Sequence, residues 1–155
     1  MTGVQTCALP ICDGVAVGLL RQHGIKSGVL SAKSSQPLLT RATQLGMDVI
    51  KLGFSRKLEA IAQISAEWQI PPARIAFAGD DIIDIPVMRR IGVAYAPADA
   101  HPLVRKVATH VTASLGGRGV AREIAEDLLA ARGLTLTEMY AHLLEDDDAL
   151  GDLVQ

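Results

Sequence analysis

The feature that most constrains the fold is an apolar run that ends in a glycine and a group of carboxylates. Residues 75–78 are apolar and short, which is typical of a buried strand in a parallel sheet. Gly79 follows directly, and Asp80, Asp81 and Asp84 come next. Ligands of open α/β sheets bind beyond the carboxyl ends of the strands, so this motif predicts a site at that edge.

Three carboxylates this close together repel one another unless a cation or a lysine neutralises them. Oxygen ligands of this kind suit Mg²⁺, which is often bound by one or two carboxylates and by phosphate oxygens of a substrate. The alternative is a solvated acidic turn that caps a helix. From this motif alone, both interpretations remain open.

The first twelve residues differ in character from the rest of the chain. Residues 1–11 resemble the translation of a sequencing-library adapter, and Cys12 would lie at the junction. The segment holds both cysteines, Cys7 and Cys12, and no charged residue. A signal peptide would need a basic start and a longer apolar stretch. We therefore expect residues 1–12 to be non-native and outside the fold, with the native chain entering near Asp13 and its original start missing.

The composition excludes several classes of protein. A length of 155 residues indicates one domain. The net charge of −2, without a basic cluster, argues against a nucleic-acid partner. No apolar run approaches the roughly 20 residues of a membrane span. Beyond Cys12 there is no cysteine, which agrees with a cytoplasmic protein.

Short apolar strands alternate with helical patterns along the whole chain. This order predicts right-handed βαβ units, and therefore an α/β fold of three layers with a Rossmann-like parallel sheet. We expect a core at residues 13–132, then a C-terminal helix and acidic tail at 133–155. The predicted strands are 26–30, 48–52, 75–78, 92–95 and 110–112. The predicted helices are 14–22, 36–44, 57–68, 83–90, 102–108, 120–132 and 135–144.

Three of these strands should deliver polar side chains to one edge of the sheet. Ser31, the segment 53–57 and Asp80 each follow a predicted strand. Ser31 also lies just before a helix start, where backbone N–H groups favour an anion. Lys57 can offset the charge of a phosphate and of the aspartates. Taken singly, Ser31 is more often a cap and Lys57 a surface lysine, but together with the aspartates they favour a site for phosphate and magnesium.

The chain resembles the haloacid-dehalogenase-like phosphohydrolases, and within them the 3-deoxy-D-manno-octulosonate 8-phosphate phosphatases. The resemblance covers roughly residues 13–132 and is most specific at 79–88. It is carried by the segments 13–14, 19–20, 24–25, 30–35, 41–42, 45–46, 53–57, 79–88, 98–100 and 116–123.

The resemblance implies a role for each candidate residue. Ser31 would hydrogen-bond the transferring phosphoryl group, and Lys57 would neutralise it. Asp80 would be the Mg²⁺ ligand, while Asp81 and Asp84 would support the metal shell and Lys57. Arg122 would bind substrate, in the same subunit or in a neighbouring subunit of a homotetramer. The expected substrate is a small phosphorylated sugar acid.

The main departure from the family concerns its first motif. That motif is a strand ending in Asp-x-Asp, whose first aspartate is the nucleophile and whose second is the general acid and base. Ile11 stands two residues before Asp13, so Asp13 does not complete such a motif. We therefore expect a sheet that lacks its first, nucleophile-bearing strand between the strands ending at Ser31 and Asp80, and a chain without activity.

Smaller departures concern the phosphate loops, where Ala32, Lys33 and Arg56 replace the residues usual in the family. These affect specificity for phosphate and sugar. Two other functions stay open at this point: the phosphatase-like C-terminal domain of an acylneuraminate cytidylyltransferase, and a non-catalytic oligomerisation module.

Overall fold

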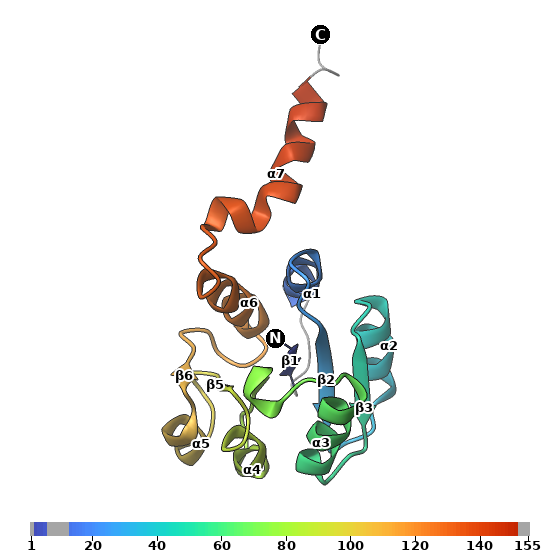
Figure 1. Cartoon of the computed structure of the whole chain (residues 1–155), viewed down its shortest axis with the longest axis vertical. Helices are drawn as coiled ribbons and strands as arrows, with labels where there is room; N and C mark the ends of the chain where they lie inside the picture. The colour runs from blue at the N-terminus through green and yellow to red at the C-terminus, as the bar shows by residue number, and fades with distance from the viewer. Residues whose placement is uncertain (1, 6–12, 152–155) are drawn as a thin grey trace.

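The computed structural model describes residues 2–5 and 13–151. Its centre is a six-stranded parallel sheet with the strand order β3-β2-β1-β4-β5-β6 (Figure 1). The strands are β1 (Thr2–Gln5), β2 (Ser27–Ser31), β3 (Val49–Leu52), β4 (Ile75–Ala78), β5 (Val93–Ala96) and β6 (His110–Val111). The helices are α1 (Asp13–Gln22), α2 (Gln36–Gln44), α3 (Lys57–Glu67), η1 (Pro72–Arg74), η2 (Ile82–Asp84), α4 (Ile85–Met88), α5 (Pro102–Val107), α6 (Val120–Ala130) and α7 (Leu136–Gly151).

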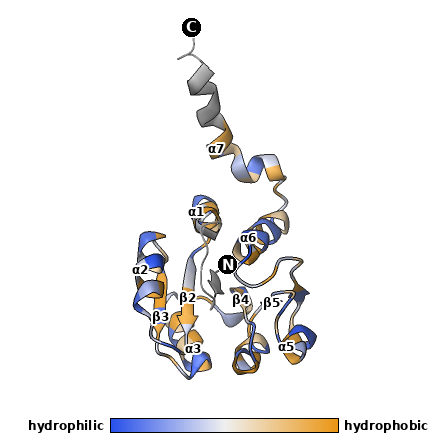
Figure 2. Cartoon of the chain, turned by 180° about the vertical axis from the view of Figure 1, so that it is seen from behind, coloured by the Kyte–Doolittle hydropathy of each residue, from blue (hydrophilic) through white to orange (hydrophobic). Residues whose placement is uncertain are grey.

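The expected α/β fold of three layers is confirmed. Alternate residues of β4 serve the two faces of the sheet, as the two-residue period of a strand requires. Ile75 and Phe77 join a core under α3, α4 and α5, whereas Ala76 and Ala78 join a second core under α1 and α6. Figure 2 shows that β3 and the carboxyl end of β2 are hydrophobic, while α2, with a single buried residue, is largely hydrophilic.

Strand β1 corrects the expectation that the segment 1–12 lies outside the fold and that the centre of the sheet is vacant. Thr2–Gln5 occupies that central place and pairs in parallel with both β2 and β4. The physical reason is the backbone: without a strand here, the facing N–H and C=O groups of β2 and β4 would lack partners in the middle of the sheet. Residues 1 and 6–12, which include Cys7 and Cys12, lie outside the described residues.

Elsewhere the expected elements agree with the structure to within a few residues, with two exceptions. The predicted helix 83–90 is divided into the 3₁₀ turn η2 and the short helix α4, because Asp81 and Asp84 form a reciprocal cap at this point. The predicted C-terminal helix continues to Gly151, so the acidic run 145–148 is helical. Figure 1 shows α7 projecting away from the sheet and its covering helices.

The base of α7 is fixed to the rest of the molecule. Met139 is buried in the core under α1 and α6, and its carbonyl oxygen lies 3.0 Å from Nε2 of His23. Among the residues that the structure describes, no helix combines the length and the apolar character needed to cross a membrane.

Candidate active site at the carboxyl edge of the sheet

The loop after β4 is shaped by Gly79. A Cβ atom added to this glycine would lie 2.5 Å from Cβ of Asp84, closer than real side chains approach one another. The backbone N–H of Gly79 donates to the carbonyl of Tyr95 on β5, over 3.0 Å. A residue without a side chain therefore lets the chain turn across Asp84 at the end of the strand.

Asp84 is fully buried and fixes the geometry of this loop. One carboxylate oxygen, Oδ2, accepts hydrogen bonds from the backbone N–H groups of Asp80, over 3.1 Å, and of Asp81, over 3.2 Å. The carboxylate of Asp81 in turn accepts from the N–H of Ile82 over 2.6 Å and caps η2. Asp84 thus supports the loop from within. Asp81 caps η2, which is the role expected for an acidic turn that caps a helix.

Lys57 supplies the charge that balances Asp84. Its Nζ lies 2.5 Å from Oδ1 of Asp84, and the side chain is only 6% exposed. Lys57 is the first residue of α3, so this ion pair links the helix after β3 to the loop after β4. Charges buried this deeply are kept only when they are paired and hydrogen-bonded, as both are here.

Ser31 lies at the end of β2, on the same edge of the sheet. Its hydroxyl oxygen accepts from the backbone N–H of Lys33 over 3.2 Å, and its carbonyl accepts from Phe54 N–H over 3.0 Å. The hydrogen bond from Phe54 ties the end of β2 to the loop after β3, and this loop leads to Lys57. The parallel sheet therefore brings Ser31, Lys57 and Asp80 to one edge, as the sequence predicted.

Arg122 has partners that the sequence analysis did not identify. Its Nε donates to the hydroxyl of Tyr140 over 3.1 Å and lies 3.8 Å from Oε1 of Glu126. The Tyr140 hydroxyl donates to the same carboxylate over 2.6 Å. Burial and the bond to Glu126 raise the pKa of Tyr140, which keeps the phenol protonated. In this structure Arg122 joins α6 to α7, and its role toward substrate stays a prediction.

The glycine-rich segment before α6 is held by two carboxylates that received no role from the sequence. Glu123 accepts from the N–H groups of Ala113, over 2.7 Å, and Ser114, over 2.9 Å. Asp99 accepts from Gly116 N–H over 2.7 Å. The loop after β5 also reaches the site, because His101 N–H donates to the carbonyl of Asp80 over 3.0 Å. Asp99 could have been predicted as a residue of this edge of the sheet, because it follows β5, which lies next to β4.

The carboxylates after β4 differ in their suitability as ligands of a metal ion. The carboxylate of Asp80 is a suitable oxygen ligand for Mg²⁺. Asp84 is committed to Lys57 and to two backbone N–H groups. No group of three His, Cys, Asp or Glu side chains able to hold a metal ion is found among the residues that the structure describes.

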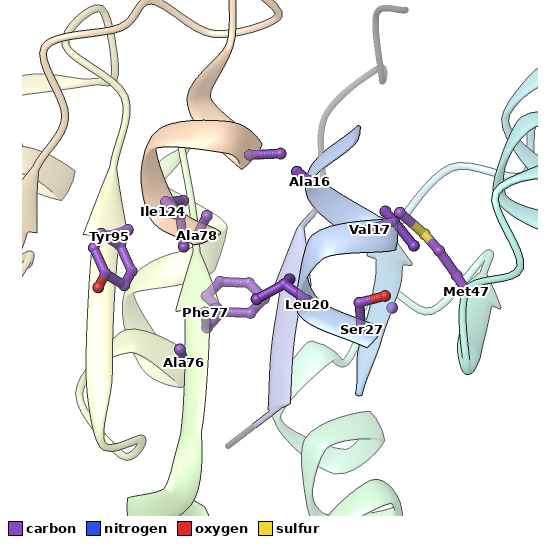
Figure 3. A pocket seen from close by; sticks show the side chains of 12 residues that line it. Ala16, Val17, Leu20, Ser27, Met47, Ala76, Phe77, Ala78, Tyr95 and Ile124 are labelled. Atoms are coloured by element: carbon purple, nitrogen blue, oxygen red, sulfur yellow. The ribbon is translucent and has the colours of Figure 1, made fainter. Parts of the chain in front are cut away.

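A pocket of about 40 Å³ lies away from these polar groups, on the face of the sheet under α1 and α6 (Figure 3). Its lining is almost entirely apolar and includes Ala16, Leu20, Ala76 and Ile124. It has no candidate catalytic side chain, so it belongs to the packing of the core rather than to the site.

Comparison with known proteins agrees with this geometry. Residues 30–124 match the sequence profile of the haloacid dehalogenase-like hydrolases. The 3-deoxy-D-manno-octulosonate 8-phosphate phosphatase of Escherichia coli K12 is 34% identical over 131 residues, which cover 84% of this chain and 70% of that protein.

Two solved structures are also similar. The phosphatase of the same name from Yersinia pestis is 30% identical, with a TM-score of 0.81, over 85% of this chain and 81% of its own. The cobalt-bound deoxy-D-mannose-octulosonate 8-phosphate phosphatase from Haemophilus influenzae is 25% identical, with a TM-score of 0.80, over 85% and 88% of the two chains. On the matched profile, the sequence identity and the shared fold, this chain belongs to the haloacid dehalogenase-like hydrolase family.

Proposed function

We propose that this chain carries the core of a magnesium-dependent phosphomonoesterase of the 3-deoxy-D-manno-octulosonate 8-phosphate phosphatase type. The observation that supports this best is the buried pair of Lys57 and Asp84, which lies at the edge of the sheet shared by Ser31 and Asp80. The similarity to phosphatases of that name supports the substrate class, a small phosphorylated sugar acid.

Each residue of the site has a distinct task in this proposal. The Ser31 hydroxyl donates a hydrogen bond to a phosphoryl oxygen, and Lys57 offsets the phosphoryl charge while Asp84 orients it. Asp80 contributes a carboxylate to Mg²⁺, whose charge would stabilise the phosphate oxygens. Asp81 keeps the loop in place through its cap. Arg122 binds substrate once it is released from Tyr140 and Glu126, and the active protein is a homo-oligomer.

The nucleophile is the part that this chain does not provide. Residues 1–12 include no aspartate or glutamate, and β1, which takes the central place in the sheet, has the sequence Thr-Gly-Val-Gln. Without a carboxylate to form a phosphoaspartate, covalent catalysis has no starting group. The proposal therefore expects phosphate recognition without turnover.

The test measures recognition and turnover separately. Calorimetric titration with inorganic phosphate in the presence of Mg²⁺ should give binding that weakens about tenfold or more in Asp80→Asn and Lys57→Met, as expected when a charge-assisted contact is lost. Lys106→Met removes an exposed lysine on α5 and should leave phosphate binding unchanged. Phosphate binding that is insensitive to both site variants would contradict the proposed site.

Turnover is assayed with p-nitrophenyl phosphate and with 3-deoxy-D-manno-octulosonate 8-phosphate, each with Mg²⁺. We expect none with either substrate. Hydrolysis that disappears in Asp80→Asn would mean that another residue of the chain acts as nucleophile.

A further inference from the structure

A second cavity lies beside the edge strand β6, and it is separate from the proposed active site. Its volume is about 120 Å³, and it is formed by β5, β6 with the residue that follows it, and α6. Figure 1 shows these elements together at the end of the sheet opposite to β3 and α2. The residues that line it are Tyr95, His110, Val111, Thr112, Glu123 and Asp127. None of the residues proposed for phosphate, magnesium or substrate belongs to this set.

The lining of this cavity is polar and negatively charged. Val111 is aliphatic, whereas the other side chains carry a phenol, an imidazole, a hydroxyl and two carboxylates. Carboxylates are ionised at pH 7. In the part of the chain that the structure describes, no lysine or arginine lines the cavity, and neither Glu123 nor Asp127 forms an ion pair. The cavity therefore favours a cation.

Both carboxylates are held in position and can still accept hydrogen bonds. Glu123 accepts from two backbone N–H groups, and Asp127 accepts from the hydroxyl of Tyr95. Burial and the bond to Asp127 raise the pKa of Tyr95, so the phenol stays protonated and remains a donor. Because an ionised carboxylate offers about four lone-pair sites, each of the two keeps acceptor capacity for a ligand.

Two aromatic rings give the cavity a flat wall. The ring centroids of Tyr95 and His110 are 5.4 Å apart, and the ring planes are inclined by 26°. Tyr95 is buried, which fixes its ring, whereas His110 is exposed on the edge strand. A planar cation can stack on aromatic rings while it donates hydrogen bonds in its own plane. The wall and the carboxylates therefore suit the same kind of group.

We propose that this cavity binds a guanidinium group. A guanidinium is planar, carries N–H donors in a fork that matches carboxylates, and stacks on aromatic faces. Its size also fits, because a cavity of about 150 Å³ holds a whole benzene molecule. The group belongs either to a free small compound or to an arginine side chain of a second copy of this chain. The proposal is independent of the proposed function.

The first experiment compares methylguanidinium with methylurea, which has a similar planar shape but no charge. Calorimetric titration of the full chain at pH 7.5 should show saturable binding of methylguanidinium, about tenfold or more tighter than that of methylurea. Equal affinity for the two compounds, or no saturable binding of methylguanidinium, would overturn the proposal.

Matched variants test whether the carboxylates of the cavity are responsible. Asp127→Asn removes one charge but leaves an oxygen to accept from Tyr95, and it should weaken methylguanidinium binding about tenfold. Glu67→Gln removes the same charge from an exposed position on α3 and should leave the affinity unchanged. Equal effects of the two variants would mean that the compound responds to net charge and not to this cavity.

NMR of the histidine rings locates the compound in the unmodified chain, whether or not the variants fold. The chain has four histidines, and the signal lost in His110→Gln identifies that of His110. With methylguanidinium, the His110 signal should shift along the same saturation curve as the calorimetric titration, and the other three should not. A His110 signal that does not move would overturn the proposal.

Sedimentation velocity distinguishes the two sources of the guanidinium group. If an arginine of a second copy occupies the cavity, saturating methylguanidinium should displace it and lower the mass of the assembly. If the natural ligand is a free compound, the mass should stay the same while methylguanidinium binds. Both results support the proposal, and they assign the cavity to an interface or to a small-molecule site.

Discussion

The two faces of the sheet are built differently. The face under α3, α4 and α5 is closed by large apolar side chains, among them Phe77, Ile64 and Val87, and the Lys57–Asp84 pair lies at its edge. The face under α1 and α6 has a core of similar kind but keeps the apolar pocket. The polar site therefore borders the face that α3, α4 and α5 cover, whereas the pocket lies on the other face of the sheet, under α1 and α6.

The largest effect should come from the closed face. Phe77→Ala removes the largest fully buried side chain and should lower the free energy of unfolding by about 3–5 kcal/mol, because the truncation leaves a large cavity in the core. Urea denaturation followed by circular dichroism measures this. A loss below about 1 kcal/mol would show that this face is not well packed.

The buried ion pair should come next. Lys57→Ala leaves the Asp84 carboxylate buried without its cation and should cost about 3 kcal/mol. In the double variant Lys57→Met with Asp84→Leu, no charge is left unpaired, so most of this loss should be recovered. If the single and double variants unfold at the same urea concentration, the cost belongs to packing and not to charge.

Shortening a side chain on the face under α1 and α6 should lower the free energy of unfolding less than Phe77→Ala does. Leu20 lines the pocket, and Leu20→Ala should lower stability by about 2 kcal/mol, at the low end for buried leucines, because part of its surroundings is already empty. Both variants are measured by urea denaturation, so their free energies of unfolding can be compared. An equal loss of stability in Leu20→Ala and Phe77→Ala would remove the distinction between the two faces.

The smallest effect should come from Glu123, which holds the glycine-rich segment. Burial raises the pKa of this carboxyl, but hydrogen bonds from Ser114 and Ala113 outweigh it, so the pKa lies below its ordinary value of 4.5. The resulting stability is complete above pH 4.5 and is lost as the pH falls through the lowered value.

Glu123→Gln should therefore destabilise the protein at pH 7 by less than about 1 kcal/mol, since the group is partly solvated. The difference from the unmodified chain should shrink as the pH falls through the lowered pKa, because the carboxylate is then protonated in both the folded and the unfolded protein. Thermal unfolding over a series of pH values below 7 measures it. A stability difference between Glu123→Gln and the unmodified chain that grows on acidification would contradict the role given to the Glu123 carboxylate.

The sequence predicted those parts of the structure that depend on local pattern. The helix at 36–44 and the strand at 75–78 are found at the predicted bounds, because helical spacing and a buried apolar run are local signals. The convergence of Ser31, Lys57 and Asp80 followed from the parallel sheet. Ser31, Lys57 and Asp80 also lie in segments that carry the resemblance to the family.

What the sequence did not predict depends on contacts between distant segments. Thr2–Gln5 is a segment of only four residues, one of them a glycine, and its place is set by the backbone groups of β2 and β4 that it pairs with. Arg122 contacts Tyr140 and Glu126, and these contacts depend on how α7 is placed against α6. Neither the place of β1 nor the partners of Arg122 can be predicted from a short stretch of sequence.

The pairing of β1 with β4 also has a consequence for synthesis on the ribosome. Thr2 is paired with Ile75, so during synthesis this edge of β1 waits for a partner that is made 73 residues later. At about 5–20 residues per second, the 73 residues from 2 to 75 take on the order of 4 to 15 s. During that interval β2 can already pair with β1 and β3, but the edge of β1 that β4 later covers stays open.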